Sequence, residues 1–508
     1  MKVKLFTIFL CFSTALSAEQ IPLSAIDWLA QTRPSPTVPQ TNTQETGARS
    51  STGTSVPEIS VSPLETINVD SVGLLPPSTT GLPVSIWRNS RGRDVIQLMR
   101  AMPNSRTPAI QSVFYSLLLA EADAPQVDND SGSFLAARIE TLIKLGAVNP
   151  ALALLERASP LPAPLVPTFF DVSLYDSSIP PSCDQVLSMG ATYPDDATRI
   201  YCVARKGDWL TSTLILQTAE ALGTLSDREA SLLHAFLETA DQDDLFASLP
   251  PPSRVSPLEF RLYEAIGAPL SANLLPRAFS NSDLNGDNGW KLQLAAAERL
   301  SETGAIGENQ LLGIYTLHEP SASGGIWDRV AAFQKLDRAL EIGDPDEVAQ
   351  ALDLAWSVFA KTPLKYSFAN IFAERLLDIP FAGSDRIYAA RVAILSGYFE
   401  RAAQNLDGQD SFLRAIAEGS FSEVIPQSDT ERAIFDAFRA PRIPTAIDAL
   451  VTQGKLGEVI LNALIQFEKG AQGDPQDLLE ALSTMRLVGL ENTARRAAIA
   501  VYLAQDSR

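Results

Sequence analysis

Residues 145–151 read LGAVNPA: an apolar run ends at Gly146, and a proline follows within four residues. A glycine just past a helix can adopt the left-handed conformation that closes the last turn, and proline is favoured in the first turn of a helix. The stretch therefore predicts two helices joined by a tight turn. The same junction recurs at six further glycines, namely Gly207, Gly304, Gly343, Gly397, Gly454 and Gly489.

Repeated junctions of this kind produce antiparallel helical hairpins, and stacked hairpins form an α-solenoid. The separations between the junction glycines are uneven, as positions 207, 304 and 343 show. A strict tetratricopeptide array keeps a period of about 34 residues. The pattern therefore predicts an all-α fold, an irregular, tetratricopeptide-like α-solenoid of helical hairpins.

Local signals between residues 169 and 259 also favour helices. Ser226 and Glu229 have the spacing of a capping box, as do Ser256 and Glu259, where Pro257 adds a favourable first helical residue. Strand-like runs such as residues 169–174 (FFDVSL) are few and short. We expect the body of the protein to be nearly all helix.

The first 18 residues have the features of a secretory signal peptide. Lys2 and Lys4 precede an apolar run over residues 5–12, and small residues follow at 15–18. This order predicts cleavage after Ser17 or Ala18. The apolar run is too short to span a bilayer, and no later stretch reaches the roughly 20 apolar residues of a membrane helix. We therefore expect a periplasmic protein without a membrane span.

The chain after the signal peptide divides into three parts. Residues 19–82 are rich in Pro, Ser and Thr and predict a disordered tether with apolar islands. Residues 83–280 form a first helical-repeat section, and residues 281–508 form a second.

One apolar island of the tether is a candidate docking segment. Its apolar side chains are Ile21, Leu23, Ile26, Trp28 and Leu29. An apolar peptide on a long tether raises its local concentration near a binding partner. Two other interpretations stay open: the segment packs on the body of its own chain, or it is a remnant of the export signal.

The negative charge of the chain argues against some classes of binding partner. It has 40 basic and 60 acidic residues, a net charge of −20. An acidic protein is repelled by nucleic acid and by anionic lipid surfaces. We therefore expect no nucleic-acid partner and no binding to anionic membranes.

Residues suited to catalysis are scarce. The chain has two histidines, His234 and His318, and neither belongs to a motif with metal-ligand spacing. No nucleophile elbow, P-loop or dinucleotide-binding motif is present. We expect no cofactor, no metal and no enzymatic activity.

One segment imitates a calcium-binding loop. Asp283, Asn285 and Asp287 alternate as calcium ligands do. However, Asn288 occupies the position where an EF-hand has glycine, and Leu294 occupies that of the bidentate glutamate. We interpret the segment as a polar turn before the next helix.

The cysteines predict a disulfide bond. Cys11 leaves with the signal peptide, so Cys183 and Cys202 remain as a pair in an oxidising compartment. The turn at Pro194 and Asp195 can return the chain between them. The alternative is a pair of buried thiols.

Several segments resemble one family. They are residues 72–77 (VGLLPP), residues 81–83 (GLP) with Trp87, residues 134–140 (FLAARIE) and residues 199–209 (RIYCVARKGDW). Together they resemble the poorly characterised periplasmic helical-repeat proteins of alphaproteobacteria. The resemblance implies a helical-repeat fold in the periplasm, and it transfers no catalytic residue. Helical periplasmic proteins of these bacteria include accessory factors of the flagellar motor.

The sequence thus favours a non-enzymatic periplasmic scaffold or adaptor. Its partner would be another component of the cell envelope, either a protein or a glycan. The flagellar motor is one such assembly. The alternative is an envelope-remodelling hydrolase of peptidoglycan or glycan that uses carboxylates. Adjacent pairs such as Asp195 and Asp196 could do acid–base work, but in a chain this acidic we expect such pairs as ordinary surface residues.

Overall fold

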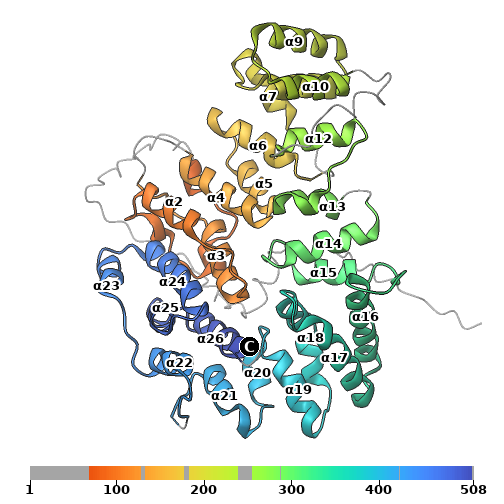
Figure 1. Ribbon diagram of the computed structural model, residues 1–508. Helices are drawn as coiled ribbons and strands as arrows, with labels where there is room; N and C mark the ends of the chain where they lie inside the picture. The colour runs from red at the N-terminus through yellow and green to blue at the C-terminus, as the bar shows by residue number, and fades with distance from the viewer. Residues whose placement is uncertain are drawn as a thin grey trace, which may run out of the picture. The chain divides into compact units, whose positions relative to one another are not determined.

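The computed structural model describes residues 68–126, 132–176, 182–237, 254–285, 288–422 and 424–505. Throughout these ranges the regular structure is helical (Figure 1). The extended contacts recorded among them are two isolated parallel bridges, Leu75 with Ala120 and Arg91 with Gln126. The described part of the chain is therefore all-α.

Short and long helices alternate in the N-terminal part. Their bounds are η2 (Val69–Ser71), α1 (Pro77–Thr80), η3 (Val84–Trp87), α2 (Gly92–Ala101), α3 (Pro108–Leu119), α4 (Ser133–Leu145), α5 (Val148–Arg157), η4 (Ala163–Leu165) and α6 (Val166–Ser173). The next group is α7 (Cys183–Met189), η5 (Gly190–Thr192), α8 (Asp196–Arg205), α9 (Trp209–Leu222), α10 (Asp227–Leu237), α12 (Pro257–Ala265), η6 (Ala272–Leu274), η7 (Arg277–Phe279) and α13 (Ser280–Asn285).

Longer helices dominate the C-terminal half. They begin with α14 (Trp290–Ser301), α15 (Glu308–Tyr315), α16 (Ile326–Ile342), α17 (Pro345–Phe359), α18 (Lys365–Asp378), α19 (Gly383–Ala393), α20 (Phe399–Ala403) and η8 (Gly408–Asp410). They end with α21 (Ser411–Glu418), α22 (Asp429–Arg439), α23 (Thr445–Thr452), α24 (Leu456–Ala471), α25 (Pro475–Leu487) and α26 (Glu491–Gln505).

The junction that opened the sequence analysis forms as predicted. Gly146 ends α4 with φ 89°, and its amide donates to the carbonyl of Ile143 at 3.0 Å. The amide of Ala147 donates to Leu142 at 2.9 Å, which completes the left-handed helix end. Positive φ is also found at five of the six other predicted junctions, namely Gly207, Gly304, Gly343, Gly454 and Gly489. Gly397 is different: it has no positive φ, and its amide donates to Asn370.

The two predicted capping boxes are confirmed. Ser256 Oγ accepts from the Glu259 amide, and the Glu259 side chain accepts from the Ser256 amide. Ser226 and Glu229 exchange the same pair of bonds. The strand-like run of residues 169–174 is helical, in line with the expected nearly all-helical body, because all but the last of its residues belong to α6. Phe170 and Ser173, one turn apart, are both buried on this helix.

Most helices pack against their neighbours in the sequence. Helix α4 packs on α5, α8 on α9, α16 on α17, α18 on α19 and α24 on α25. The core of the α14–α19 group is aromatic, with ring centroids 4.7 Å apart for Phe333 and Phe372 and for Phe359 and Phe368. Aromatic pairs at such distances add to the stabilisation that burial of their area provides.

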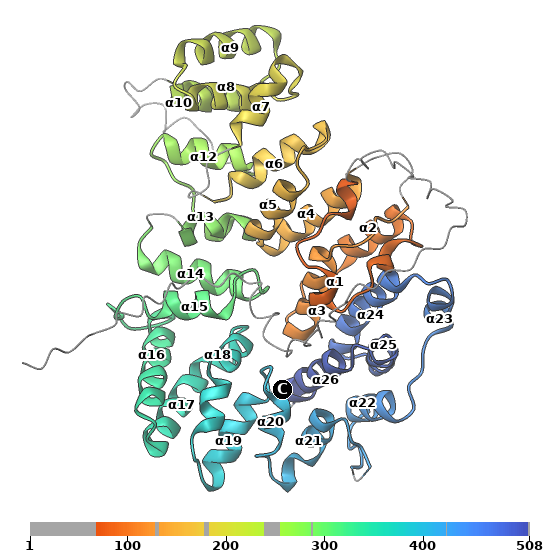
Figure 2. The same ribbon diagram turned by 180° about the vertical axis from the view of Figure 1, so that it is seen from behind.

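The last helices depart from this sequential order. Helix α24 packs on α2 and α3, and α26 packs on α3 and α21. Figures 1 and 2 both show these C-terminal helices beside the N-terminal ones. Asn89 adds polar contacts, since its Nδ2 donates to the carbonyls of Gln453 at 3.3 Å and Gly454 at 3.4 Å.

Trp87 packs between α4 in the N-terminal part of the chain and α24 in its C-terminal part. Its side chain is 1% exposed, and its ring meets the Phe134 ring edge-on with centroids 5.7 Å apart. On the other side it lies against Gly457 of α24. A Cβ atom at Gly457 would lie 2.1 Å from the Trp87 ring, which is closer than van der Waals contact permits. Glycine at this position is therefore required by close packing.

We predict that Gly457→Ala lowers the free energy of unfolding by about 1–3 kcal/mol, because the added methyl group overpacks the Trp87 contact. Chemical denaturation measures this change. The control is Gly313→Ala on the exposed side of α15, where a Cβ meets nothing within 4 Å. There alanine should stabilise by about 0.5–1 kcal/mol through its helix propensity. Equal effects at both positions would contradict the packing argument.

Ordered structure begins earlier than the sequence suggested. Residues 68–82, assigned above to the tether, form η2 and α1. Asp70 of η2 is 1% exposed and caps α4, whose N-cap residue Gly132 has no side chain to do so. Its Oδ2 accepts from the Gly132 amide at 2.9 Å, and its Oδ1 accepts from the Leu135 amide at 2.7 Å. A distant carboxylate thus replaces a local cap.

Arg138, also on α4, forms hydrogen bonds with the backbone of the segments around it. Its Nε donates to Leu118 O at 2.6 Å, its Nη1 to Val72 O at 2.6 Å and its Nη2 to Ala120 O at 3.3 Å. Burial lowers the pKa of Arg138 to about 10, and Asp70 acts in the opposite direction. The guanidinium therefore stays charged at neutral pH inside the core.

We predict that Asp70→Ala lowers the free energy of unfolding by about 2–3 kcal/mol. The change leaves two buried amides without an acceptor and removes the negative charge nearest Arg138. Asp385→Ala, at an exposed position in the first turn of α19, is the control and should change stability by no more than about 0.5 kcal/mol. Urea unfolding should give clearly different free energies of unfolding for the two variants. If it does not, the capping role assigned to Asp70 fails.

Candidate docking surface on helix α9

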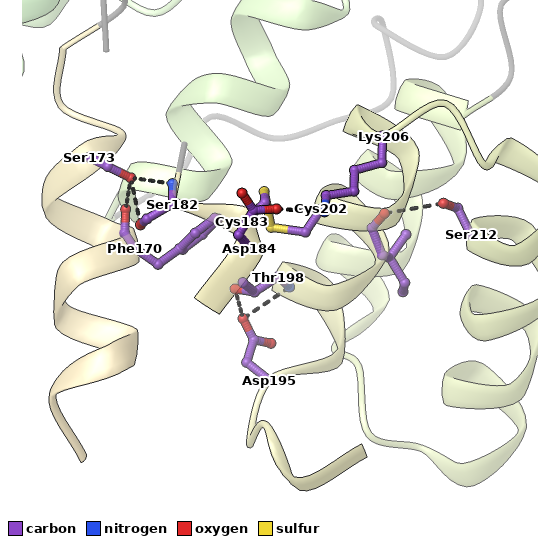
Figure 3. Close-up of a disulfide and its surroundings, with 11 residues drawn as sticks. Phe170, Ser173, Ser182, Cys183, Asp184, Asp195, Thr198, Cys202, Lys206 and Ser212 are labelled. Carbon is purple, nitrogen blue, oxygen red and sulfur yellow. Dashed lines mark hydrogen bonds and ion pairs between the residues drawn. A yellow bond between two sulfur atoms is a disulfide. The ribbon is translucent and has the colours of Figure 1, made fainter. Parts of the chain in front are cut away.

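The two cysteines that the sequence predicted to pair are joined. A disulfide bond links Cys183, the first residue of α7, to Cys202 in α8, with their Cα atoms 5.2 Å apart and a sequence separation of 19 (Figure 3). An ion pair between Asp184 and Lys206 connects the same two helices. Cys202 is fully buried, and the bond lies in the core that α6 to α12 share.

The chain returns between the cysteines at the turn that the sequence indicated. Asp195 is the N-cap of α8, and its carboxylate accepts from the amides of Ala197 and Thr198, each at 3.1 Å. These bonds fix where α8 begins and therefore where Cys202 lies. Asp195 thus has a structural role, and both of its oxygens are engaged.

Helix α9 packs on this disulfide-linked group. Asp208 caps its N-terminus by accepting from the Thr211 amide at 3.1 Å, and hydrogen bonds from Thr211 lower the pKa of Asp208. Ser212 Oγ donates to the Ile200 carbonyl of α8 at 3.3 Å. On the same inward side, Leu216 and Ala219 are buried. This side of α9 faces α8 and α10.

The opposite side of α9 exposes large apolar side chains, with Thr211, Gln217 and Thr218 exposed between them. Leu210 is 84% exposed, Leu214 is 62% exposed and Leu222 is 71% exposed. Trp209, 47% exposed, lies at the start of the helix with its ring 5.8 Å from that of Phe236. Leu210 and Leu214 are one turn apart and so share a face. We call Trp209, Leu210, Leu214 and Leu222 the α9 surface.

Charge is absent from most of this helix. Residues 209–219 (WLTSTLILQTA) contain no ionisable side chain. Glu220 is the first, and it lies 3.0 Å from His234 Nε2 of α10. The uncharged stretch mixes leucines with Thr, Ser and Gln, so α9 exposes apolar area without any charge beside it.

Figure 2 shows α8 and α10 together on one side of α9. Using typical side-chain areas, the four exposed side chains present roughly 500 Å² of apolar surface in total, divided by the exposed Gln217 and Thr218. The disulfide holds α7 to α8, and α8 supports α9, so the surface rests on a cross-linked base.

The other residues that the sequence singled out lie outside the α9 surface. The docking segment Ile21, Leu23, Ile26, Trp28 and Leu29 lies outside the described residues. His318 contacts the Trp290 ring edge-on, with ring centroids 5.4 Å apart. The calcium-like segment is helical up to Asn285, which donates to Asp176 at 2.6 Å.

The described ranges contain no cluster of three or more His, Cys, Asp or Glu side chains that could bind a metal ion. Nor do these ranges contain a helix with the length and apolar character needed to cross a bilayer.

The α9 surface was not predicted from the sequence, although a signal was present. An eleven-residue helical stretch without charge, in an acidic chain, indicates a helix with apolar residues on more than one face. Comparison with known proteins adds no further guidance: no protein-family profile, curated protein or solved structure matches the chain.

We predict that replacing both cysteines, Cys183→Ser with Cys202→Ser, lowers the free energy of unfolding by about 3 kcal/mol. A cross-link that closes a loop of this length restricts the unfolded chain by about that amount. Reductant should lower the free energy of unfolding of the native protein by the same amount. It should leave the free energy of unfolding of the double variant unchanged. Labelling of both thiols in denatured, unreduced protein would show that the bond is absent.

Proposed function

We propose that this protein is a non-enzymatic periplasmic scaffold that holds another envelope component on the α9 surface. The observation that supports it most is the exposed leucine ridge of Leu210, Leu214 and Leu222 on an uncharged helix. Exposing such side chains to water is unfavourable, and covering them on binding is the usual driving force for association.

The chemistry of the ridge favours a protein partner over a glycan. Leucine side chains offer apolar area and no hydrogen-bonding group, whereas a sugar presents hydroxyls that need polar partners. An amphipathic helix of a partner would match leucines spaced along one face. The uncharged stretch also spares a partner the repulsion that the rest of an acidic chain imposes.

The proposal includes the finer architecture predicted from the sequence. Sequential packing of neighbouring helices and the left-handed glycines at their ends support an irregular, tetratricopeptide-like arrangement of hairpins. The disulfide supports export to an oxidising compartment. A place beside the flagellar motor rests on the family resemblance alone, and the segment around Trp28 is proposed as a second, tethered contact.

We predict that Leu210→Glu with Leu214→Glu abolishes partner capture and leaves folding intact. The two side chains are exposed, so the unfolding midpoint should stay unchanged while the apolar contact is lost. Crosslinking in intact cells, followed by purification and mass spectrometry, measures capture. Leu274→Glu is the matched control, since Leu274 is 85% exposed but lies in η6. It should capture the same partner as the unmodified protein.

Loss of capture in the control as well, or capture by the α9 double variant, would contradict the proposal. The carboxylate hydrolase is tested separately by incubating the protein with cell-wall sacculi. Release of soluble glycan fragments would overturn the scaffold assignment and favour the hydrolase. A protein that releases none, and loses its partner on α9 substitution, fits the scaffold.

A further inference from the structure

The exposed residues of α9 include a stripe with regular spacing. Leu210, Leu214, Gln217 and Ala221 are all exposed, and they are separated by four, three and four positions. This is the spacing of the seam along which two helices pack in a coiled coil, and it places all four residues on one side of the helix. The stripe lies opposite the buried side of α9, which faces α8 and α10 (Figure 2).

The spacing of this stripe is the same when it is read from either end. Its midpoint coincides with that of the helix, Trp209–Leu222. When a second α9 runs antiparallel to the first with the midpoints aligned, Leu210 of each copy lies opposite Ala221 of the other. Leu214 of each copy then lies opposite Gln217. The stripe is therefore complementary to itself, as a two-fold symmetric contact between identical chains requires.

Charge does not oppose such a contact, although the chain as a whole has a net charge of −20. Residues 209–219 contain no ionisable side chain, so two copies can meet there without placing like charges side by side. Glu220, the next residue, lies 3.0 Å from His234 Nε2 of α10 in its own chain. Antiparallel packing also brings the positive end of each helix dipole beside the negative end of the other.

The area of the α9 surface indicates a weak dimer. With roughly 500 Å² of apolar surface on each copy, pairing buries about 1,000 Å² in total, which is near the lower limit for a specific interface. Gln217 lowers the affinity further, because a polar residue in a helical seam fixes the register at a cost in stability. We therefore expect a reversible dimer in exchange with the monomer.

We infer that two copies of this protein pair through α9, antiparallel and about a two-fold axis, when no partner occupies that surface. Each copy covers Leu210 and Leu214 of the other, which removes apolar area from water. The inference rests on the proposed function only in that it uses the same surface. A bound partner and a second copy therefore exclude each other.

Sedimentation velocity of the full mature chain tests the pairing. Between about 1 and about 200 μM protein, the average sedimentation coefficient should rise from the monomer value toward the dimer value. Leu210→Glu with Leu214→Glu should remain monomeric, because pairing would bring four carboxylates together. Leu274→Glu is the control, since Leu274 is equally exposed but lies in η6, and it should dimerise as the unmodified protein does. An unmodified chain that is monomeric at every concentration overturns the inference.

Added cysteines test the register of the pair. Cys183 and Cys202 are joined to each other, so an introduced cysteine supplies the free thiol of the mature chain. A mixture of Leu210→Cys protein and Ala221→Cys protein should form an intermolecular disulfide on mild oxidation, because these positions face each other. Each variant alone should crosslink at least about tenfold less, since its two thiols would lie about 16 Å apart along the helix axis. Equal crosslinking in the mixture and in the single variants overturns the antiparallel pairing.

These results separate the dimer from the proposed function. If the unmodified chain is monomeric and the α9 double variant loses its partner, the inference fails and the proposed function stands. If the chain dimerises through α9 and the double variant still captures its partner, the inference stands and the proposed function fails.

Discussion

The buried guanidinium of Arg138 is the interaction on which the N-terminal half depends. It binds Val72, Leu118 and Ala120 through their carbonyls. Such a cation is tolerated inside a core only when its donors are satisfied and a counter-charge is near. Asp70 supplies that charge and caps the same helix. Two segments that are distant in the sequence, residues 72–77 and 134–140, therefore meet at one contact.

Other, less buried arginines also donate to backbone carbonyls of distant segments. Arg299 donates to the carbonyls of Ala272 and Leu275, and Arg375 donates to that of Asp337. A planar guanidinium with five donors can satisfy several helix-end carbonyls at once. In an irregular helical array, no strict repeat places a hydrogen-bond donor beside each carbonyl at a helix end. Arginine side chains connect such carbonyls here.

Local patterns predicted local structure well. The glycine junctions, the capping boxes and the cysteine pair depend on neighbouring residues, so their signals are visible in the sequence. Contacts between distant segments were not predictable in this way. Nothing near Asp70 indicates that it caps a helix beginning at Ser133, which is why residues 68–82 read as tether. The exposure of Leu210 and Leu214 likewise depends on which side of α9 its neighbours cover, and a single sequence does not show that.

The packing of α24 on α2 has a consequence for the order of events during biogenesis. Asn89 and Gln453 are separated by 364 positions in the chain. Contacts over such a separation form late, because the intervening chain must first be synthesised and brought into place. Trp87 therefore stays without its α24 partner until almost the whole polypeptide has been synthesised. A chain that lost its last helices would keep that indole uncovered, and the exposed apolar surface would favour aggregation or proteolysis.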